Sequence, residues 1–418
     1  MSADRQAIVV SFADGNRFSP RVQRTERLVS ALEREFDFRV GRVPGPPGRA
    51  PGPLKTTLPR RVARRALRPL VLDPFEIRAR FALRRWKPSA RGALLIGWPF
   101  SPIYIAASQL HAAGIPYVVD VGDSWALADP APAPWSRLLP RRRARAAETF
   151  LWRHASAGVV TTERHAHGLR ALFPGLDLLV RPNGYTSADE PTVGSEDLGA
   201  APEAPNRAPT QNDRELRLVQ FGSVNPFKLS IGEWLSKLRR SAALTRVRFA
   251  NYGSVDRPDL LESEDPAVVI ELHEPVEWAR ARQIARGFDA AVVTANRDPA
   301  QLPSRAIQYQ TLPVPRVAVT ASSDPGELGA FAARRPGFIA VDVESPEDVP
   351  RLISHLRRPW PEDELRPPAT DSWEAVARQV VRFAIEAWER ERTAGRRDGE
   401  RVATAPGRGA APLATRRG

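Results

Sequence analysis

Short apolar runs recur along the first part of the chain, and each is followed by a polar loop and then by a longer stretch with helical periodicity. The first run spans residues 7–12, and its helix is expected at about 21–35. Apolar runs that do not alternate with polar residues are typical of strands covered on both faces of a parallel sheet. We therefore expect an N-terminal Rossmann-like α/β domain over residues 1–185. Its other expected elements are strands at about 93–97, 117–121 and 158–161 and a helix at 103–113.

A second series of the same kind follows a polar break at residues 186–213. The break is acidic and rich in Ala, Pro, Ser and Asn, so it cannot bury enough apolar surface to order itself and is expected to be a linker. The second series predicts a C-terminal Rossmann-like domain over residues 214–370. The tail at 393–418 is rich in Gly, Ala and Arg and is expected to be disordered. The expected strands of this series are 216–222, 247–253, 268–272, 289–294, 316–320 and 339–341, and its helices are 231–240, 278–286 and 304–312.

The composition narrows the chemistry of the protein. The 418 residues include no Cys and six His, so disulfides, Cys-ligated zinc or iron–sulfur sites and thiolate nucleophiles are excluded. The His residues form no H-E-x-x-H or comparable pair, and we therefore expect neither a metal site nor a cofactor. The chain lacks an apolar run of about 18 residues and a basic N-terminal region followed by an apolar stretch, so we expect a cytoplasmic protein.

The charge is strongly basic, with 62 Lys and Arg against 48 Asp and Glu and a net charge of +14. A basic surface attracts nucleic acid, anionic lipid or a phosphorylated substrate. Residues 38–72 contain no acidic residue, and a basic insert is expected at about 39–91. This insert is either an Arg-rich solvated segment or a peripheral contact with an anionic membrane. Because the basic residues are not interleaved with aromatic residues as in known nucleic-acid-binding modules, we do not expect nucleic acid as the partner.

Two loops carry candidate anion-binding residues. In the first, Ser304 is expected to be the N-cap of a helix, with Arg305 in the first turn, where free N–H groups and a guanidinium could bind one phosphate. In the second, Gly222 follows a strand and Lys228 is one of only four Lys in an Arg-rich chain. Each loop also has an ordinary interpretation, a surface Arg in the first case and a plain strand–helix connection in the second. Ligands of doubly wound folds bind beyond the carboxyl ends of the strands, where both loops lie.

Several short motifs, taken in their order along the chain, resemble those of the retaining group-1 (GT4-like) glycosyltransferases of the GT-B superfamily. The similarity extends over about residues 7 to 390. The motifs that carry it are Asp120-Val121-Gly122-Asp123-Ser124-Trp125, Arg181-Pro182-Asn183-Gly184-Tyr185, Phe221-Gly222-Ser223 with Lys228, Pro303-Ser304-Arg305 with Gln308-Tyr309 and Pro315, and Ser372-Trp373-Glu374.

The resemblance implies an α/β fold of the GT-B type, with two Rossmann-like domains facing a central cleft and a C-terminal helix at 371–392 that crosses back. It implies a nucleoside-diphosphate sugar as donor, a glycan or lipid-linked acceptor on the N-terminal domain, and no required metal. Lys228 and Arg305 would stabilise the leaving diphosphate. Asp123 would lie near the acceptor, although a simple loop-capping role is the alternative. The donor-binding positions implied are Gly15, Asn16, Gly222, Ser223, Pro303, Ser304 and Gln308.

The sequence also departs from the family pattern. Two Glu that the family often carries in this loop and helix correspond here to Ala300 and Gln308. A Gln side chain hydrogen-bonds a ribose hydroxyl more weakly than a carboxylate does. The alternatives to a glycosyltransferase are therefore a catalytically silent GT-B protein that binds a nucleotide or a partner, a nucleotide-sugar epimerase and, last, a basic nucleic-acid-binding protein.

Overall fold

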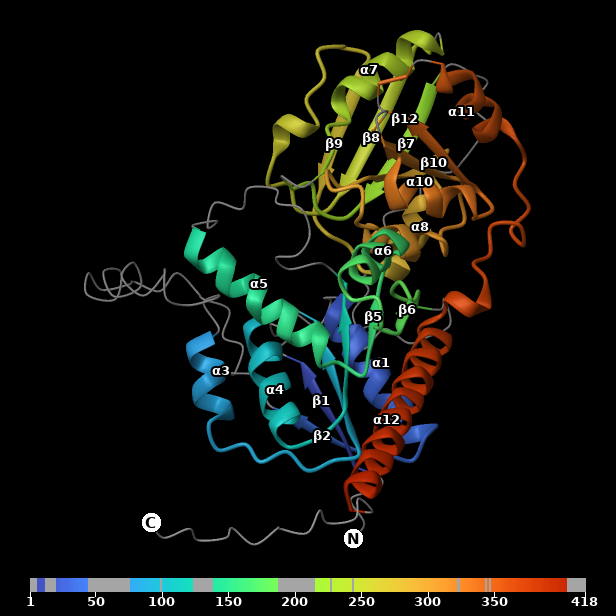
Figure 1. Cartoon of the computed structure of the whole chain (residues 1–418). Helices are drawn as coiled ribbons and strands as arrows, with labels where there is room; N and C mark the ends of the chain where they lie inside the picture. The colour runs from blue at the N-terminus through green and yellow to red at the C-terminus, as the bar shows by residue number, and fades with distance from the viewer. Residues whose placement is uncertain are drawn as a thin grey trace, which may run out of the picture.

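The chain forms two parallel six-stranded sheets, which lie one above the other in Figure 1. The computed structural model describes residues 6–11, 20–43, 76–97, 100–122, 138–186, 215–225, 228–242, 244–321, 324–342, 344–345 and 347–403. None of the helices in these ranges is both long enough and apolar enough to span a bilayer.

The N-terminal sheet has the strand order β2-β1-β3-β4-β5-β6. One face is covered by α1 and α12, and the other by α3, α4, α5 and α6. Burial on both faces explains why the strands are apolar without alternation. The strands are β1 (Gln6–Ser11), β2 (Arg39–Val43), β3 (Gly92–Ile96), β4 (Tyr117–Val121), β5 (Ala157–Val160) and β6 (Leu178–Val180). The helices are α1 (Pro20–Arg34), α3 (Glu76–Leu83), α4 (Phe100–Ala112), α5 (Leu138–Arg153) and α6 (Glu163–Leu172).

The C-terminal sheet has the order β12-β11-β10-β7-β8-β9. The chain runs outward from β7 through β8 to β9 and then returns to the other side of β7, so the topological switch point lies between β7 and β10. The strands are β7 (Glu215–Phe221), β8 (Arg246–Tyr252), β9 (Val268–His273), β10 (Ala290–Thr294), β11 (Arg316–Thr320) and β12 (Phe338–Asp342). The helices are α7 (Gly232–Ser241), α8 (Trp278–Ala285), α9 (Ser304–Tyr309), α10 (Gly326–Ala333) and α11 (Asp348–Arg357).

Helix α12 (Trp373–Ala403) follows the second sheet but packs on the first, alongside α1 (Figure 1). Trp388 is fully buried against β3, where a Cβ on Gly92 would lie 2.1 Å from its indole ring. A short bridge between Tyr185 and Ser372 pairs the two segments that connect the halves of the molecule. The C-terminal segment is therefore part of the N-terminal core.

The fold class predicted from the sequence, two Rossmann-like α/β domains of the GT-B type with a returning helix, is confirmed by the two sheets and α12. Three boundary predictions were wrong. Residues 39–43 of the expected basic insert are strand β2, which pairs with β1, and α9 ends at residue 309 rather than 312. Helix α12 continues to residue 403, so residues 393–403 are helical and not disordered. The expected linker at 186–213, apart from its first residue, and the tail at 404–418 lie outside the described residues.

Candidate functional site

The carboxyl edge of the C-terminal sheet, at the switch point between β7 and β10, gathers the two predicted loops. Gly222 follows β7 with φ +137°, a backbone conformation that favours glycine. A Cβ at this position would lie 3.5 Å from Cγ and 3.6 Å from Nε of Arg305. The Arg305 side chain, which comes from the first turn of α9, therefore lies against the bare backbone of the loop that leads to Lys228.

Lys228 is held at the end of β10. Its Nζ donates a hydrogen bond to the Thr294 carbonyl at 3.1 Å, and a short bridge joins its backbone to Asn296. The side chain is half-buried and has no carboxylate partner among the described residues, so burial lowers the pKa of its ammonium to about 8. A cation that is desolvated and unpaired in this way is stabilised when an anion approaches.

Arg305 is the second cation at this edge. It is exposed, and its guanidinium carbon lies 5.7 Å from the centre of the Trp278 ring. Within the described part of the chain it forms no ion pair with a carboxylate. Lys228 and Arg305 thus leave two positive charges without a counter-ion at one sheet edge, an arrangement that suits a polyanionic group.

Helix α9 is fixed at its C-terminal end by hydrogen bonds to Phe221 and Arg316. The Tyr309 hydroxyl accepts a hydrogen bond from the Phe221 backbone N–H and donates one to the Phe221 carbonyl at 3.0 Å. The fully buried Arg316 donates from Nε to the Tyr309 carbonyl at 3.0 Å and from Nη2 to the Gln310 carbonyl at 2.7 Å. These bonds hold α9 to the end of β7 and so fix the position from which Arg305 extends.

The predicted N-cap of α9 was wrong. Pro303 occupies the N-cap position, Ser304 is the first helical residue, and no side-chain hydrogen bond caps the helix. The first-turn N–H groups of α9 are therefore not capped by Ser304.

Aromatic rings line the outer part of the same edge. Tyr252 and His273, at the ends of β8 and β9, stack with their ring centres 4.4 Å apart and an interplanar angle of 11°. Phe221 stacks on Tyr252, and Trp278 stacks on Tyr309. Phe221 and Tyr309 are buried, whereas Tyr252, His273 and Trp278 are at least partly exposed, and a planar heterocycle can stack on rings of this kind.

The N-terminal domain contacts the loops that follow β10 and β11. The Thr162 hydroxyl, which caps α6, donates a hydrogen bond to the Ala300 carbonyl at 2.9 Å. The Arg164 backbone N–H donates to Glu327 Oε1 at 2.9 Å, and its guanidinium pairs with both carboxylate oxygens of Asp324, with Nη2 to Oδ1 at 2.6 Å. The start of α6 therefore seats the loops of the C-terminal site against the N-terminal domain.

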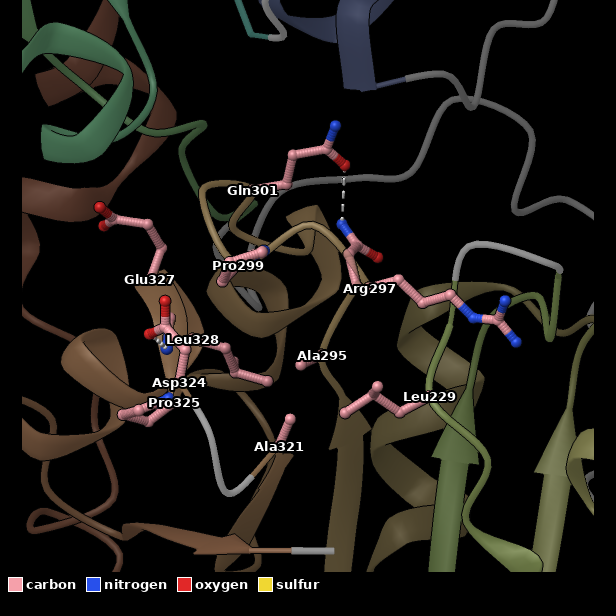
Figure 2. A pocket seen from close by; sticks show the side chains of 12 residues that line it. Leu229, Ala295, Arg297, Pro299, Gln301, Ala321, Asp324, Pro325, Glu327 and Leu328 are labelled. Carbon is pink, nitrogen blue, oxygen red and sulfur yellow. Dashed lines mark hydrogen bonds between the residues drawn. The ribbon is translucent and has the colours of Figure 1, made fainter. Parts of the chain in front are cut away.

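A small pocket of about 100 Å³ lies between these two loops. Figure 2 shows Gln301, Asp324 and Glu327 around it, with the apolar side chains of Leu229 and Leu328 on opposite sides. Asn296, which also lines it, donates from Nδ2 to Gln301 Oε1 at 3.2 Å. Amide and carboxylate groups next to apolar side chains are suited to a small hydroxyl-rich group.

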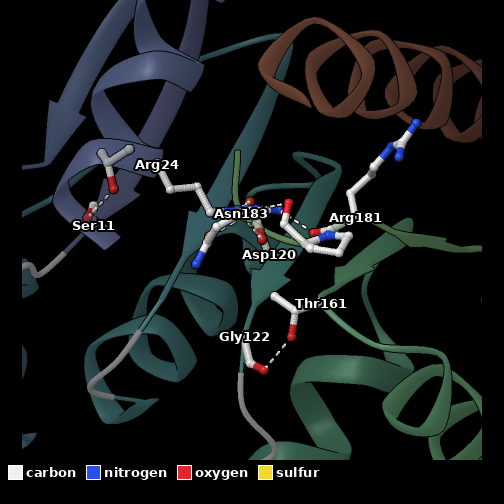
Figure 3. Close-up of polar contacts among 9 residues, drawn as sticks. Ser11, Arg24, Asp120, Gly122, Thr161, Arg181 and Asn183 are labelled. Carbon is white, nitrogen blue, oxygen red and sulfur yellow. Dashed lines mark hydrogen bonds and ion pairs between the residues drawn. The ribbon is translucent and has the colours of Figure 1, made fainter. Parts of the chain in front are cut away.

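At the carboxyl end of β4, the N-terminal domain contains a buried ion pair (Figure 3). Arg24 and Asp120 are 5% and 1% exposed, and Arg24 Nε lies 3.0 Å from Oδ1 and 2.8 Å from Oδ2 of Asp120. Arg24 also donates to the carbonyls of Arg181 and Pro182 and to Asn183 Oδ1, at 3.2 to 3.3 Å. The pair binds α1, β4 and the segment after β6 together, and its charges are satisfied internally.

The structure brings Gly222, Lys228 and Arg305 to one edge, with Pro303 and Ser304 beside them. The two other predicted donor-binding residues have different contacts. Ser223 is exposed and its hydroxyl accepts from Asn225, whereas Gln308 Oε1 accepts from the Thr186 backbone N–H at 3.4 Å. The predicted residues Gly15, Asn16 and Asp123 lie outside the described residues.

Several residues of the site were missed at the sequence level. Thr162 carried a local signal, because a Thr followed by an acidic residue is typical of a helix start, whereas Arg164 carried none. Arg24 carried none, because its partner Asp120 is 96 positions away in sequence. The described residues contain no group of three or more His, Asp or Glu placed to hold a metal ion.

Comparison with known proteins gives structural similarities only. No protein-family model matches the chain, and no curated protein sequence matches it. Solved structures that are similar include HepE from Anabaena in complex with UDP and glucose (12% identity, TM-score 0.48, covering 96% of this chain and 100% of that one). They also include a UDP-forming α,α-trehalose-phosphate synthase from Burkholderia xenovorans (13%, 0.46, 96% and 100%) and a putative UDP-N-acetylglucosamine 2-epimerase from Listeria monocytogenes (12%, 0.46, 91% and 94%). Identities and TM-scores this low do not extend the activity of those proteins to this chain.

Proposed function

We propose that this protein is a glycosyltransferase that moves a sugar from a nucleoside-diphosphate sugar to a glycan or lipid-linked acceptor, with retention of configuration. One observation carries the proposal: two cations without a carboxylate partner in the described chain lie at the switch point of the C-terminal sheet, Arg305 against Gly222 after β7 and Lys228 against the Thr294 carbonyl at the end of the neighbouring β10. A diphosphate supplies the charge that this arrangement lacks.

The two cations would act on the leaving group. When the bond between the anomeric carbon and the diphosphate oxygen breaks, its electron pair remains on that oxygen. Lys228 and Arg305 then stabilise the growing negative charge through fixed electrostatics, without a divalent ion. Because α9 is held by Tyr309 and Arg316, Arg305 extends from a fixed position when this charge develops.

The residues around the two cations indicate where the base and the sugar of the donor would bind. The stacked Tyr252 and His273 rings support the planar base, and the pocket at Gln301 and Glu327 supports the sugar on the side that faces α6. The acceptor would approach from the N-terminal domain, where Gly15, Asn16 and Asp123 are the residues proposed from the sequence.

A catalytically silent nucleotide-binding protein is the second candidate. The two positions at which the family often carries Glu, Ala300 and Gln308, are both engaged in contacts with the N-terminal half and its connection. The Ala300 carbonyl accepts from Thr162, and the Gln308 amide accepts from Thr186. Contacts of this kind would hold the two halves of the molecule together without any role in catalysis. Binding of a nucleoside diphosphate without turnover of any sugar derivative would favour this candidate.

The test compares nucleoside diphosphates with the bare nucleosides by isothermal titration calorimetry, after a thermal-shift screen across UDP, GDP, ADP and their sugars. Lys228→Ala and Arg305→Ala are each expected to weaken diphosphate binding by about 10- to 100-fold, as loss of one charge-assisted contact predicts, and to leave nucleoside binding unchanged. Lys237→Ala and Arg286→Ala remove the same charges from α7 and from the end of α8 and serve as controls. Equal diphosphate affinity in the wild type and both site variants would refute the phosphate assignment.

A further inference from the structure

Basic side chains are exposed on α5, on α3 and in the residues that follow α3, on one side of the N-terminal domain. Both helices pack on α4, and in Figure 1 they lie on the side of the domain away from α12. The buried Glu76 carboxylate joins them, with Oε1 2.8 Å from Arg80 Nη2 on α3 and 3.4 Å from Arg143 Nη2 on α5. We call this surface the α3–α5 face. Its exposed basic residues are Arg80, Arg84, Arg85, Lys87, Arg142 and Arg145.

The described residues of this face present no negative charge outward. The only acidic residues within 76–91, 100–112 and 138–153 are Glu76 and Glu148, which are 3% and 1% exposed. A solvated surface with mixed charges would interleave carboxylates with its basic residues. The α3–α5 face is instead uniformly cationic, and it is assembled from segments more than fifty positions apart in sequence.

An apolar side chain lies on the exposed side of α3, in its last turn. Phe81 is 81% exposed, more than the two other large hydrophobic residues that are exposed in the described chain, Leu172 and Leu272. Glu76, Ala79 and Leu83 mark the buried side of α3, and by helical geometry Phe81 points to the opposite side. The exposed Arg84 and Arg85 follow in the turn after the helix. A single exposed Phe is common on protein surfaces, but here the ring is flanked by exposed Arg in a short helix and in the turn after it.

We propose that the α3–α5 face docks the protein on an anionic lipid bilayer. The basic residues contact anionic headgroups, and the Phe81 ring enters the boundary between the headgroups and the acyl chains. The two features together favour this partner, because a nucleic-acid duplex, whose bases are already stacked on one another, would match the charge and leave the ring without an apolar environment. The proposal is independent of the activity of the C-terminal site, since none of these residues contacts the switch-point edge.

The absence of Cys allows a direct test in the full-length chain. Phe81→Cys, labelled with the environment-sensitive fluorophore NBD, reports whether this position enters a bilayer, and Leu172→Cys on α6, at a site that is 53% exposed, is the labelled control. Vesicles of phosphatidylcholine alone are compared with vesicles that also contain phosphatidylglycerol. We expect a blue shift and a rise in NBD emission at position 81 with the anionic vesicles only, and none at position 172.

Charge reversal tests the electrostatic part in the unlabelled protein. Arg84→Glu/Arg85→Glu is expected to reduce co-sedimentation with anionic vesicles by about tenfold or more, whereas Arg246→Glu/Arg286→Glu, at two exposed positions of the C-terminal domain, leaves it unchanged. Added salt should weaken binding of the wild type. The proposal is overturned by equal binding to neutral and anionic vesicles, by binding to neither, or by anionic-vesicle binding with unchanged NBD emission at position 81. Binding to duplex DNA that is lost in Arg84→Glu/Arg85→Glu, without vesicle binding, would assign the face to nucleic acid instead.

Discussion

The two halves of the molecule repeat one architecture but use the carboxyl edges of their sheets differently. In the N-terminal half, the charge at the end of β4 is paired internally, because Arg24 is bound by Asp120 and by the segment after β6. In the C-terminal half, Lys228 and Arg305 stand at the end of β7 and β10 without a carboxylate partner in the described chain. We propose that the N-terminal edge, whose charges are satisfied, acts as scaffold, and that the C-terminal edge, with its two unpaired cations, binds an anionic ligand.

This contrast predicts opposite responses to removal of charge. In a buried ion pair, loss of one partner leaves an uncompensated charge in a low-dielectric environment, which is strongly destabilising. At a site that binds an anion, loss of an unpaired cation removes a repulsive or desolvated charge from the free protein and costs mainly binding. The following substitutions test this difference, from the largest expected effect to the smallest.

Asp120→Asn should have the largest effect on stability. The change leaves the Arg24 guanidinium buried without its counter-charge, so we expect the free energy of unfolding to fall by about 3–5 kcal/mol. Chemical denaturation followed by circular dichroism measures it. Asp348→Asn, which breaks a more exposed pair with Arg351, should cost less than about 1 kcal/mol and serves as the control. A loss at Asp120 no larger than in this control would show that the N-terminal edge is not held by its ion pair.

Lys228→Met should show the reverse pattern at the C-terminal edge. Substitution removes a desolvated charge but also the hydrogen bond to the Thr294 carbonyl, so the free energy of unfolding should equal that of the wild type or exceed it by up to about 1 kcal/mol. Nucleoside-diphosphate affinity of the same variant should fall by about 10- to 100-fold. The two measurements are made on one preparation, by denaturation and by calorimetry. A variant that is destabilised as much as Asp120→Asn would mean that Lys228 is part of the scaffold.

The strands that form the two sheets could largely be predicted from sequence, whereas the two edge strands of the N-terminal sheet and the N-cap of α9 could not. Ten of the twelve strands were predicted, because burial on both faces leaves a local apolar run, as in residues 117–121 and 290–294. Strand β6 (Leu178–Val180) was missed because three residues are too few for a recognisable apolar run. Strand β2 was missed because its sequence, Arg-Val-Gly-Arg-Val, reads as part of a basic insert and lies at a sheet edge. The N-cap of α9 is Pro303 and not Ser304. This short helix is held in place by tertiary contacts such as the hydrogen bond from Tyr309 to Phe221, so it does not need a capping side chain.

Long-range pairing limited the prediction of the site. The order of motifs pointed to Lys228 and Arg305, whose loops the fold then brought to one edge, although their role in binding a diphosphate stays a prediction. Arg24 could not be assigned, because its ion pair with Asp120 depends on the packing of α1 against β4 and leaves no trace in local periodicity. The roles of Gly15, Asn16 and Asp123 remain predictions from the motifs alone.

The pH dependence of binding separates the two cations of the C-terminal edge. In the free protein the pKa of Lys228 is lowered from 10.5 to about 8, so the ammonium loses its proton as the pH rises through 8. A bound diphosphate favours the charged form and raises this pKa, so diphosphate affinity should be highest below pH 8. Above it, affinity should fall by up to about tenfold per pH unit. Lys228→Arg should remove this dependence, since guanidinium stays charged. Calorimetry at pH 7 and pH 9.5 checks both proteins, and an identical decline in the two would assign the titration to another group.

The lowered pKa of Lys228 also affects the stability of the free protein, which should rise with pH while the affinity for diphosphate falls. Because the unfolded chain binds a proton at Lys228 up to its ordinary pKa of 10.5, the lowered value in the folded state costs stability below about pH 8. That cost is relieved as the pH rises from 8 to 10.5. Lys228→Met should lack this rise, which is measured as the difference between the two proteins in unfolding free energy at pH 7 and at pH 9.5.

Thr162→Val should give the smallest effect, because it acts on the contact between the halves rather than on a charge. Valine keeps the shape of the side chain but loses the hydroxyl that caps α6 and that donates to the Ala300 carbonyl, with an expected stability loss of about 1 kcal/mol. The loop that carries Ala300 also lines the pocket at Gln301, whereas the diphosphate is assigned to Lys228 and Arg305. The affinity for a nucleotide sugar should therefore weaken by about threefold while that for the nucleoside diphosphate stays constant. Thr162→Ser, which keeps the hydroxyl, should behave as the wild type. Equal weakening for both ligands would place the effect of Thr162 on the phosphate side of the site instead of the sugar side.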